Sequence, residues 1–243
     1  MSLSPAKRHL ARMQAQQQAI AAAKQSPHGA MLGGPHELML AQLHAHQRTL
    51  KAIQSLERKI EAKRKMLPDF ADYIHGVLQA DKGVQDPLIT TLLVWHLDVG
   101  DWAGGLTLGE YCLRHGLELP DQYKRNLPTM LLDEVAEAAI HGKLRGPEAL
   151  GTLARIDTLT QEYDTHDQAR AKLHKAIGWA AIGKTRTQDL STEEIKHLPL
   201  DRLQIAHQHL TRAIELDPQA GVKKDVERLD RRLKELHPPT APN

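Results

Sequence analysis

The segment from Gly178 to Thr185 has the spacing G-x-x-x-x-G-K-[ST] of a phosphate-binding loop. Such a loop binds phosphates because its backbone N–H groups follow a buried β-strand and surround the phosphate oxygens. Here the preceding residues, Ala169 to Ile177, carry three Lys or Arg side chains in the pattern of an amphipathic helix. We therefore interpret Gly178 as a close contact between helices and Gly183 as a helix stop, with nucleotide binding as the lesser alternative. On this interpretation, Lys184→Ala should leave fold and assembly near wild type.

Histidine is the second residue type that offers chemistry, since the chain contains 15 of them. The closest pairs that we consider are His44 with His46 and His207 with His209. Residues two apart on a helix point to different faces, unlike the i, i+4 pair that binds zinc. The only cysteine is Cys112, which excludes an intramolecular disulfide and is typical of a reducing cytoplasm. We therefore expect no metal site and no cofactor.

Carboxylates are what a metal-dependent nuclease needs, because a cluster of them holds Mg²⁺ beside the scissile phosphate. The acidic candidates are Asp69, Asp72, Asp98, Asp101, Asp133, Glu134 and Glu137. Acidic residues beside helix ends are more typical of caps and solvated surface. Their spacing does not distinguish a nuclease, so we assign no catalytic residue and keep an intrinsic endonuclease as an alternative.

Basic residues are concentrated at the start of the chain. Residues 1–66 contain 11 Lys or Arg against 3 Asp or Glu, and residues 67–142 contain 4 against 12. The remainder, residues 143–243, is nearly balanced, with 17 against 15. Such asymmetry predicts a basic arm that meets a polyanion, for which DNA is the first candidate. The arm could instead dock on the acidic body of another subunit.

The candidate DNA-binding residues are the basic side chains of this arm. They are Lys7, Arg8, Arg12, Arg48, Lys51, Arg58, Lys59, Lys63, Arg64 and Lys65. A solvated coiled-coil face would have the same composition. Because no helix-turn-helix with a clear recognition helix accompanies them, phosphate contact is predicted and base readout is not assigned.

The elements that carry these residues are predicted to be helices throughout. Aromatic residues make up 3% of the chain, and Ala, Leu, Gln, Lys, Glu and Arg, which favour helix, dominate. Ser4 caps a first helix over 5–24, and a second helix of about 45 Å is predicted over 36–65. An apolar stripe along the second helix predicts an oligomerisation surface. Its members are Met39, Leu43, Leu50, Ile53 and Ile60.

Further helices follow to the end of the chain. We expect them near 69–81, 87–97, 102–115, 129–141, 147–163, 169–183 and 203–216, with a two-heptad seam from Val222 to Leu236. Asp86 followed by Pro87 indicates a capped helix start, and Ser191 with Glu194 has the spacing of a capping box. Two stretches are similar to tetratricopeptide helical hairpins. The fold class is therefore all-α, with a basic N-terminal arm (1–67), an acidic helical core (68–142), C-terminal hairpins with the heptad helix (143–237) and a tail (238–243). The longest uncharged apolar run, Pro87 to His96, is half of the ~20 residues that a membrane span needs.

Several short segments, in order along nearly the whole chain, resemble the small terminase subunit of peduovirus-type phages. They are Ser4-Pro5-Ala6-Lys7-Arg8-His9, Gln47 to Ile53, Gly76-Val77-Leu78, Gln85-Asp86, Trp95 to Asp101, Arg170 to Lys175 and Ala220 to Lys224. The resemblance implies a multimeric protein that binds double-stranded phage DNA at the packaging (cos) site in the host cytoplasm. It also implies a large terminase subunit as partner, which carries the ATPase. Members are often labelled endonuclease, so three hypotheses stand: a DNA-recognition and assembly subunit, an intrinsic nuclease, and a phosphate-loop ATPase.

Overall fold

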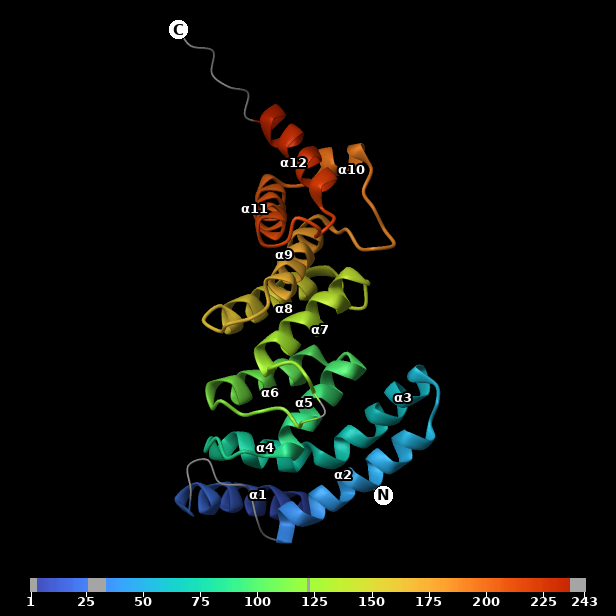
Figure 1. The fold of residues 1–243 in the computed structure, drawn as a ribbon. Coiled ribbons are helices and arrows are strands. Elements are labelled where there is room, and N and C mark those ends of the chain that lie inside the picture. The colour runs from blue at the N-terminus through green and yellow to red at the C-terminus, as the bar shows by residue number, and fades with distance from the viewer. Residues whose placement is uncertain (1–3, 26–33, 122, 237–243) are drawn as a thin grey trace. The chain divides into compact units, whose positions relative to one another are not determined.

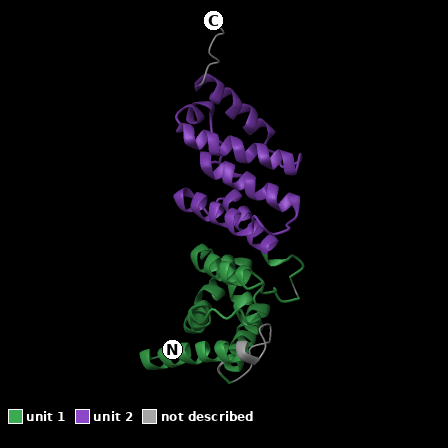
Figure 2. Cartoon of the chain, turned by 90° about the vertical axis from the view of Figure 1, so that its left-hand side faces the viewer, with its two compact units in different colours: residues 1–127 green, residues 128–243 purple. Residues whose placement is uncertain are grey.

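Helices make up the architecture of this computed structural model, which describes residues 4–25, 34–121 and 123–236 (Figure 1). Within those ranges there is no β-strand, as the composition predicts. The chain divides into two compact units, residues 1–127 and 128–243 (Figure 2). This division follows packing, whereas the sequence-based boundaries at 67 and 142 follow charge. None of the described helices is long and apolar enough to cross a bilayer.

Unit 1 is built around the apolar helix α5. Leu88, Ile89, Leu92 and Leu93 of this helix are completely buried, which makes it the centre of the unit's core. The helices of the unit are α1 (Pro5–Gln25), α2 (Gly34–Ala52), α3 (Leu56–Met66), the 3-10 helix η1 (Leu67–Phe70), α4 (Ala71–Ala80), α5 (Pro87–Val99) and α6 (Trp102–Arg114). The predicted cap of the first helix is confirmed, since the Lys7 backbone N–H donates to Ser4 Oγ at 3.4 Å.

A buried polar network fixes the start of α5. The carboxylate of Asp86 accepts hydrogen bonds from the Leu88 backbone N–H (2.9 Å) and from the Tyr73 hydroxyl (2.6 Å). Its Oδ1 also lies 3.2 Å from His36 Nε2. Because these partners belong to α2, α4 and α5, one buried carboxylate ties three helices together. Burial, followed by the charge of Asp86, raises the pKa of Tyr73 and keeps its hydroxyl a donor.

The prediction of one continuous helix over 36–65 is wrong. The chain turns back between α2 and α3, where Ser55 adopts an extended backbone (φ −68°, ψ 129°) (Figure 1). Ser55 Oγ accepts the Arg58 backbone N–H at 3.3 Å and caps α3. Serine favours this role because its hydroxyl competes with the helical backbone for hydrogen bonds. The basic arm is therefore a helical hairpin rather than a single rod.

Unit 2 is organised around the pair α9 and α11, which pack most closely at Gly178. A Cβ added at Gly178 would lie 2.6 Å from Leu210 Cγ and 3.1 Å from the carbonyl oxygen of Ala206. Gly183 caps α9 with φ +76°. Both structural interpretations of the phosphate-loop motif are thus confirmed. The helices of the unit are α7 (Leu127–Ile140), α8 (Gly146–Thr160), α9 (Asp167–Ile182), α10 (Thr192–Lys196), α11 (Leu200–Leu216) and α12 (Lys223–Leu236).

The C-terminal elements follow the sequence signals for their ends. Ser191 and Glu194 form the predicted capping box at the start of α10. Leu229 of the heptad seam is buried, whereas Leu236 at its end is exposed. The seam therefore contributes to the core of its own unit. Its pairing with another chain and the similarity to tetratricopeptide hairpins stay predictions.

Candidate nucleic-acid interface

The basic residues of α1 divide into exposed side chains and one that holds the fold together. Lys7 and Arg8 are exposed. Arg12 instead donates a hydrogen bond to Asp72 of α4 at 3.1 Å. This ion pair fastens α1 to α4, so Arg12 already has an anionic partner within its own subunit.

Four basic residues gather where α2 ends and α3 begins. Arg48 and Lys51 lie in the last turn or so of α2, and Arg58 and Lys59 lie in the first turns of α3. We call these four residues the hairpin tip. Arg48, Lys51 and Arg58 are exposed, and Glu57 is the only acidic residue from 48 to 59. The first-turn N–H groups of α3 add to the positive potential, because a helix N-terminus favours anions.

The three basic residues at the far end of α3 have partners inside unit 1. Lys63 donates a hydrogen bond to Asp98 of α5, and its ammonium group lies 5.8 Å from the centre of the Trp95 ring. Arg64 bonds to Glu61 at 2.8 Å, and Lys65 pairs with the same carboxylate at 3.4 Å. The hydrogen bond from Lys65, followed by that from Arg64, lowers the pKa of Glu61. Lys63 therefore packs α3 onto α5, while Arg64 and Lys65 remain exposed.

The predicted oligomerisation stripe does not form one exposed surface. Leu43 and Leu50 are buried in the core of unit 1. Met39, Ile53 and Ile60 are half-buried and keep part of their surface available to a second chain.

Other exposed apolar side chains lie on α1 and α2. Leu10 is 55% exposed and Leu38 is 68% exposed. Met13 is also exposed and lies three residues after Leu10, on the same face of α1. The periodicity of the sequence did not single out these residues, because it selects the face that is buried within the chain.

The phosphate-loop motif consists of the last turn of α9 and the three residues that follow it, and its lysine is paired within the protein. Lys184 Nζ lies 2.6 Å from Asp225 Oδ1 of α12 and 3.0 Å from Asp189 Oδ1. The same carboxylate of Asp225 accepts the indole N–H of Trp179 at 3.0 Å. Lys184 therefore fastens α9 to α12 instead of facing a ligand.

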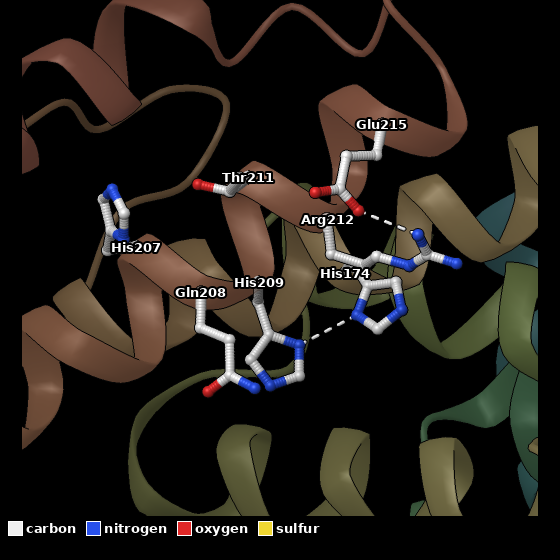
Figure 3. Close-up of a pocket in the computed structure, with 7 residues that line it drawn as sticks. All are labelled: His174, His207, Gln208, His209, Thr211, Arg212 and Glu215. Carbon is white, nitrogen blue, oxygen red and sulfur yellow. Dashed lines mark hydrogen bonds and ion pairs between the residues drawn. The ribbon is translucent and has the colours of Figure 1, made fainter.

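A second cluster of titratable groups lies in unit 2, beside a hollow of about 410 Å³ (Figure 3). The rings of His174 on α9 and His209 on α11 point toward each other, with their Nδ1 atoms 2.9 Å apart (Figure 3). Asp157 of α8 is the third member, and the donor atoms of the three lie within 4.8 Å of one another. His207 bonds to Asp230 at 2.7 Å, away from the cluster, which confirms that His207 and His209 point to different faces.

Burial controls the protonation of the two histidines. It lowers the pKa of His174 to about 4, against the opposing effect of Asp157, and it also lowers the pKa of His209. Sequence spacing did not reveal this pair, because the two residues are 35 positions apart and meet only through the packing of α9 on α11. The sequence did offer one signal. Each of two predicted helices carries a histidine, and the small residue Gly178 already indicated that one of these helices packs closely against another.

Comparison with known proteins gives one family and two relatives. The family described as phage small terminase subunit matches residues 40–168. The "Terminase, endonuclease subunit" of Escherichia phage P2 is 40% identical over 234 residues, which cover 95% of this chain and 86% of that protein. The "Probable terminase, endonuclease subunit" of Haemophilus phage HP1 (strain HP1c1) is 23% identical over 213 residues, covering 84% and 72%. No solved structure matches the chain significantly.

Proposed function

The chain belongs to the phage small terminase subunit family, and from this membership we propose that it binds double-stranded phage DNA for packaging. In this proposal the chain recognises the packaging (cos) site, assembles into a homo-oligomer and passes the DNA to the large terminase subunit in the host cytoplasm. The large subunit supplies the ATPase and the nuclease.

The observation that carries the DNA-binding proposal is the exposed, nearly acid-free hairpin tip. Arg48 and Lys51 come just before the turn between α2 and α3, Arg58 comes just after it, and all three are exposed. In this proposal one phosphate backbone contacts all three. They also lie inside the segment 40–168 that matches the family. Lysine and arginine gain affinity for DNA by releasing the counterions that phosphates hold. Such contacts position the protein on the duplex without reading its sequence.

We assign the other basic residues of the arm to the DNA surface or to the fold according to whether their side chains are exposed. Lys7, Arg8, Arg64 and Lys65 are exposed and extend the proposed surface, with Lys59 half-buried beside them. We propose that Arg12 and Lys63 stabilise the fold instead of contacting DNA, since each forms an ion pair with a carboxylate of a neighbouring helix.

Oligomerisation is proposed to use the apolar side chains on α1 and α2. Leu10 and Leu38 are exposed, and Met39 is half-buried next to Leu38. Identical subunits that meet around a rotation axis close into a ring. A ring brings several hairpin tips to one duplex, so that weak individual contacts add through high effective concentration.

The test compares the triple variant Arg48→Ala, Lys51→Ala, Arg58→Ala with wild type in fluorescence anisotropy titrations over a range of salt concentrations. We expect weaker binding to cos and to unrelated duplex alike. If each residue neutralises one phosphate, the negative slope of log K against log salt should become shallower by about 2.7 per subunit that contacts the DNA. A loss confined to cos DNA would show that the tip reads bases instead.

The matched control is the triple variant Lys223→Ala, Lys224→Ala, Arg231→Ala on α12, which removes the same charge from exposed positions. It should bind DNA nearly as wild type does. If the control abolishes binding while the tip variant binds normally, the proposed interface is wrong.

The alternative function is an intrinsic endonuclease, which the names of both relatives suggest. The geometry favours it less, because three of the acidic candidates are paired with lysines of the same chain. Lys172 bonds to both Asp133 (2.7 Å) and Glu137 (2.9 Å), and Lys63 bonds to Asp98. The hydrogen bond from Lys172 is the main cause that lowers the pKa of Glu137. Cleavage of cos DNA by the isolated protein with Mg²⁺ or Mn²⁺ would establish the alternative.

A further inference from the structure

The side chains of Asp157, His174 and His209 come from three different helices and together offer the donor atoms of a metal site. The ligand atoms lie within 4.8 Å of one another, and the two Nδ1 atoms are 2.9 Å apart. A tetrahedral zinc ion with Zn–N bonds of about 2.1 Å separates two imidazole nitrogens by about 3.4 Å. The rings therefore need to part by only about 0.5 Å to admit the ion, a movement within reach of side-chain rotation.

The chemistry of the donors selects the class of ion. Two imidazoles and a carboxylate are the donors of many zinc sites, in which water occupies the fourth position. Mg²⁺ and Ca²⁺ instead prefer oxygen ligands throughout. In the metal-free protein the Nδ1–H of one ring donates to the Nδ1 lone pair of the other, which already carries its proton on Nε2. Metal binding therefore requires only the donor ring to move its proton from Nδ1 to Nε2, after which both Nδ1 lone pairs face the ion.

The groups around the cluster hold its carboxylate in place. Arg170 Nη1 lies 3.5 Å from Asp157 Oδ1, and the same guanidinium donates to Thr160 Oγ1 at 2.9 Å. This arrangement holds the carboxylate in place, as supporting groups behind metal ligands do. Arg212, which lines the adjacent hollow, is paired with Glu215 at 2.8 Å, so its charge is partly neutralised.

We propose that Asp157, His174 and His209 bind one divalent transition-metal ion, with zinc as the best-matched ion. The ion joins α8 to the α9–α11 pair and leaves one coordination position open to the hollow of about 410 Å³. The site is contained in unit 2 and shares no residue with the proposed DNA surface, so the two proposals can fail independently.

The experiment is calorimetric titration of ZnCl₂ into full-length protein that has been dialysed against a chelator, with MgCl₂ in a parallel titration. We expect one zinc ion per chain, a raised melting temperature by mass action, and no comparable binding of magnesium. Cobalt(II) should give the visible absorbance of a tetrahedral site at the same stoichiometry.

The variants identify the ligands among the 15 histidines. His174→Ala with His209→Ala should abolish the stoichiometric site, and His207→Ala on the same helix is the control that should keep it. Asp157→Asn, which preserves shape, should weaken zinc binding by more than the ~10-fold that loss of a supporting group costs. Circular dichroism checks that each variant is folded. Absence of saturable zinc binding by the folded wild type, or unchanged binding in folded Asp157→Asn, would overturn the proposal.

Discussion

At the residue scale, Lys184 shows how an apparent ligand-binding residue can be structural. Its side chain is 12% exposed, and its ammonium group pairs with Asp225, which is itself buried and accepts the indole N–H of Trp179. Removing one partner of a buried ion pair leaves the other charge without compensation. The expectation that Lys184→Ala is neutral for the fold is revised accordingly.

Lys184→Ala should lower the free energy of unfolding by about 3 kcal/mol, because it leaves the Asp225 carboxylate buried without its cation. Urea denaturation followed by circular dichroism measures the loss. The matched comparison is Lys143→Ala, at an exposed position of the same unit, which should change stability little. Saturable micromolar ATP binding that Lys184→Ala abolishes would restore the phosphate-loop hypothesis.

At the element scale, the contact between α9 and α11 organises unit 2. Gly178 allows the two helices to approach so closely that no side chain fits between them. The same contact brings His174 opposite His209. One small residue therefore determines both the packing of the unit and the position of its proposed metal ligands.

Gly178→Ala should destabilise the protein by about 1–3 kcal/mol, since the new methyl group overlaps the buried side chain of Leu210. Gly151→Ala is the matched control. It lies in the exposed middle of α8 with open space around it, so alanine should stabilise the helix by about 0.5–1 kcal/mol. In thermal unfolding we therefore expect Gly178→Ala to lower the melting temperature and Gly151→Ala to raise it. Equal effects of the two substitutions would mean that α9 and α11 are not in close contact.

At the scale of the whole molecule, assembly depends on apolar surface that one subunit leaves uncovered. Leu50 is buried in its own unit, so a charge at that position would test folding instead of assembly. The exposed Leu10 and Leu38 are better probes, because aspartate at either position is tolerated by a monomer.

Native mass spectrometry at micromolar concentration should show a closed homo-oligomer for the wild type. Leu10→Asp with Leu38→Asp should shift it toward monomer, because charges cannot be buried unpaired in an interface. Leu200→Asp, on an exposed position of α11, is the control and should leave the oligomer intact. A monomeric wild type would rule out the assembly proposal.

Local signals in the sequence were sufficient for the fold class and for most helix ends. The Ser4 cap, the Asp86-Pro87 start of α5 and the capping box at Ser191 are all found in the structure, because each cap is satisfied within three residues of its own position. The break at Ser55 has the same local origin, but the continuous apolar periodicity around it concealed the cap. Family membership also followed from short segments that keep their order along the chain.

Only the tertiary structure decided which charged and polar side chains are free. Lys63 and Arg58 are equivalent in the sequence, yet Lys63 bonds to Asp98, 35 residues away, while Arg58 is exposed. His174 and His209 meet across a similar separation. Periodicity identifies the face of a helix that is buried, but the partner of that face depends on how the helices pack. Long-range pairs therefore cannot be derived from spacing along the chain.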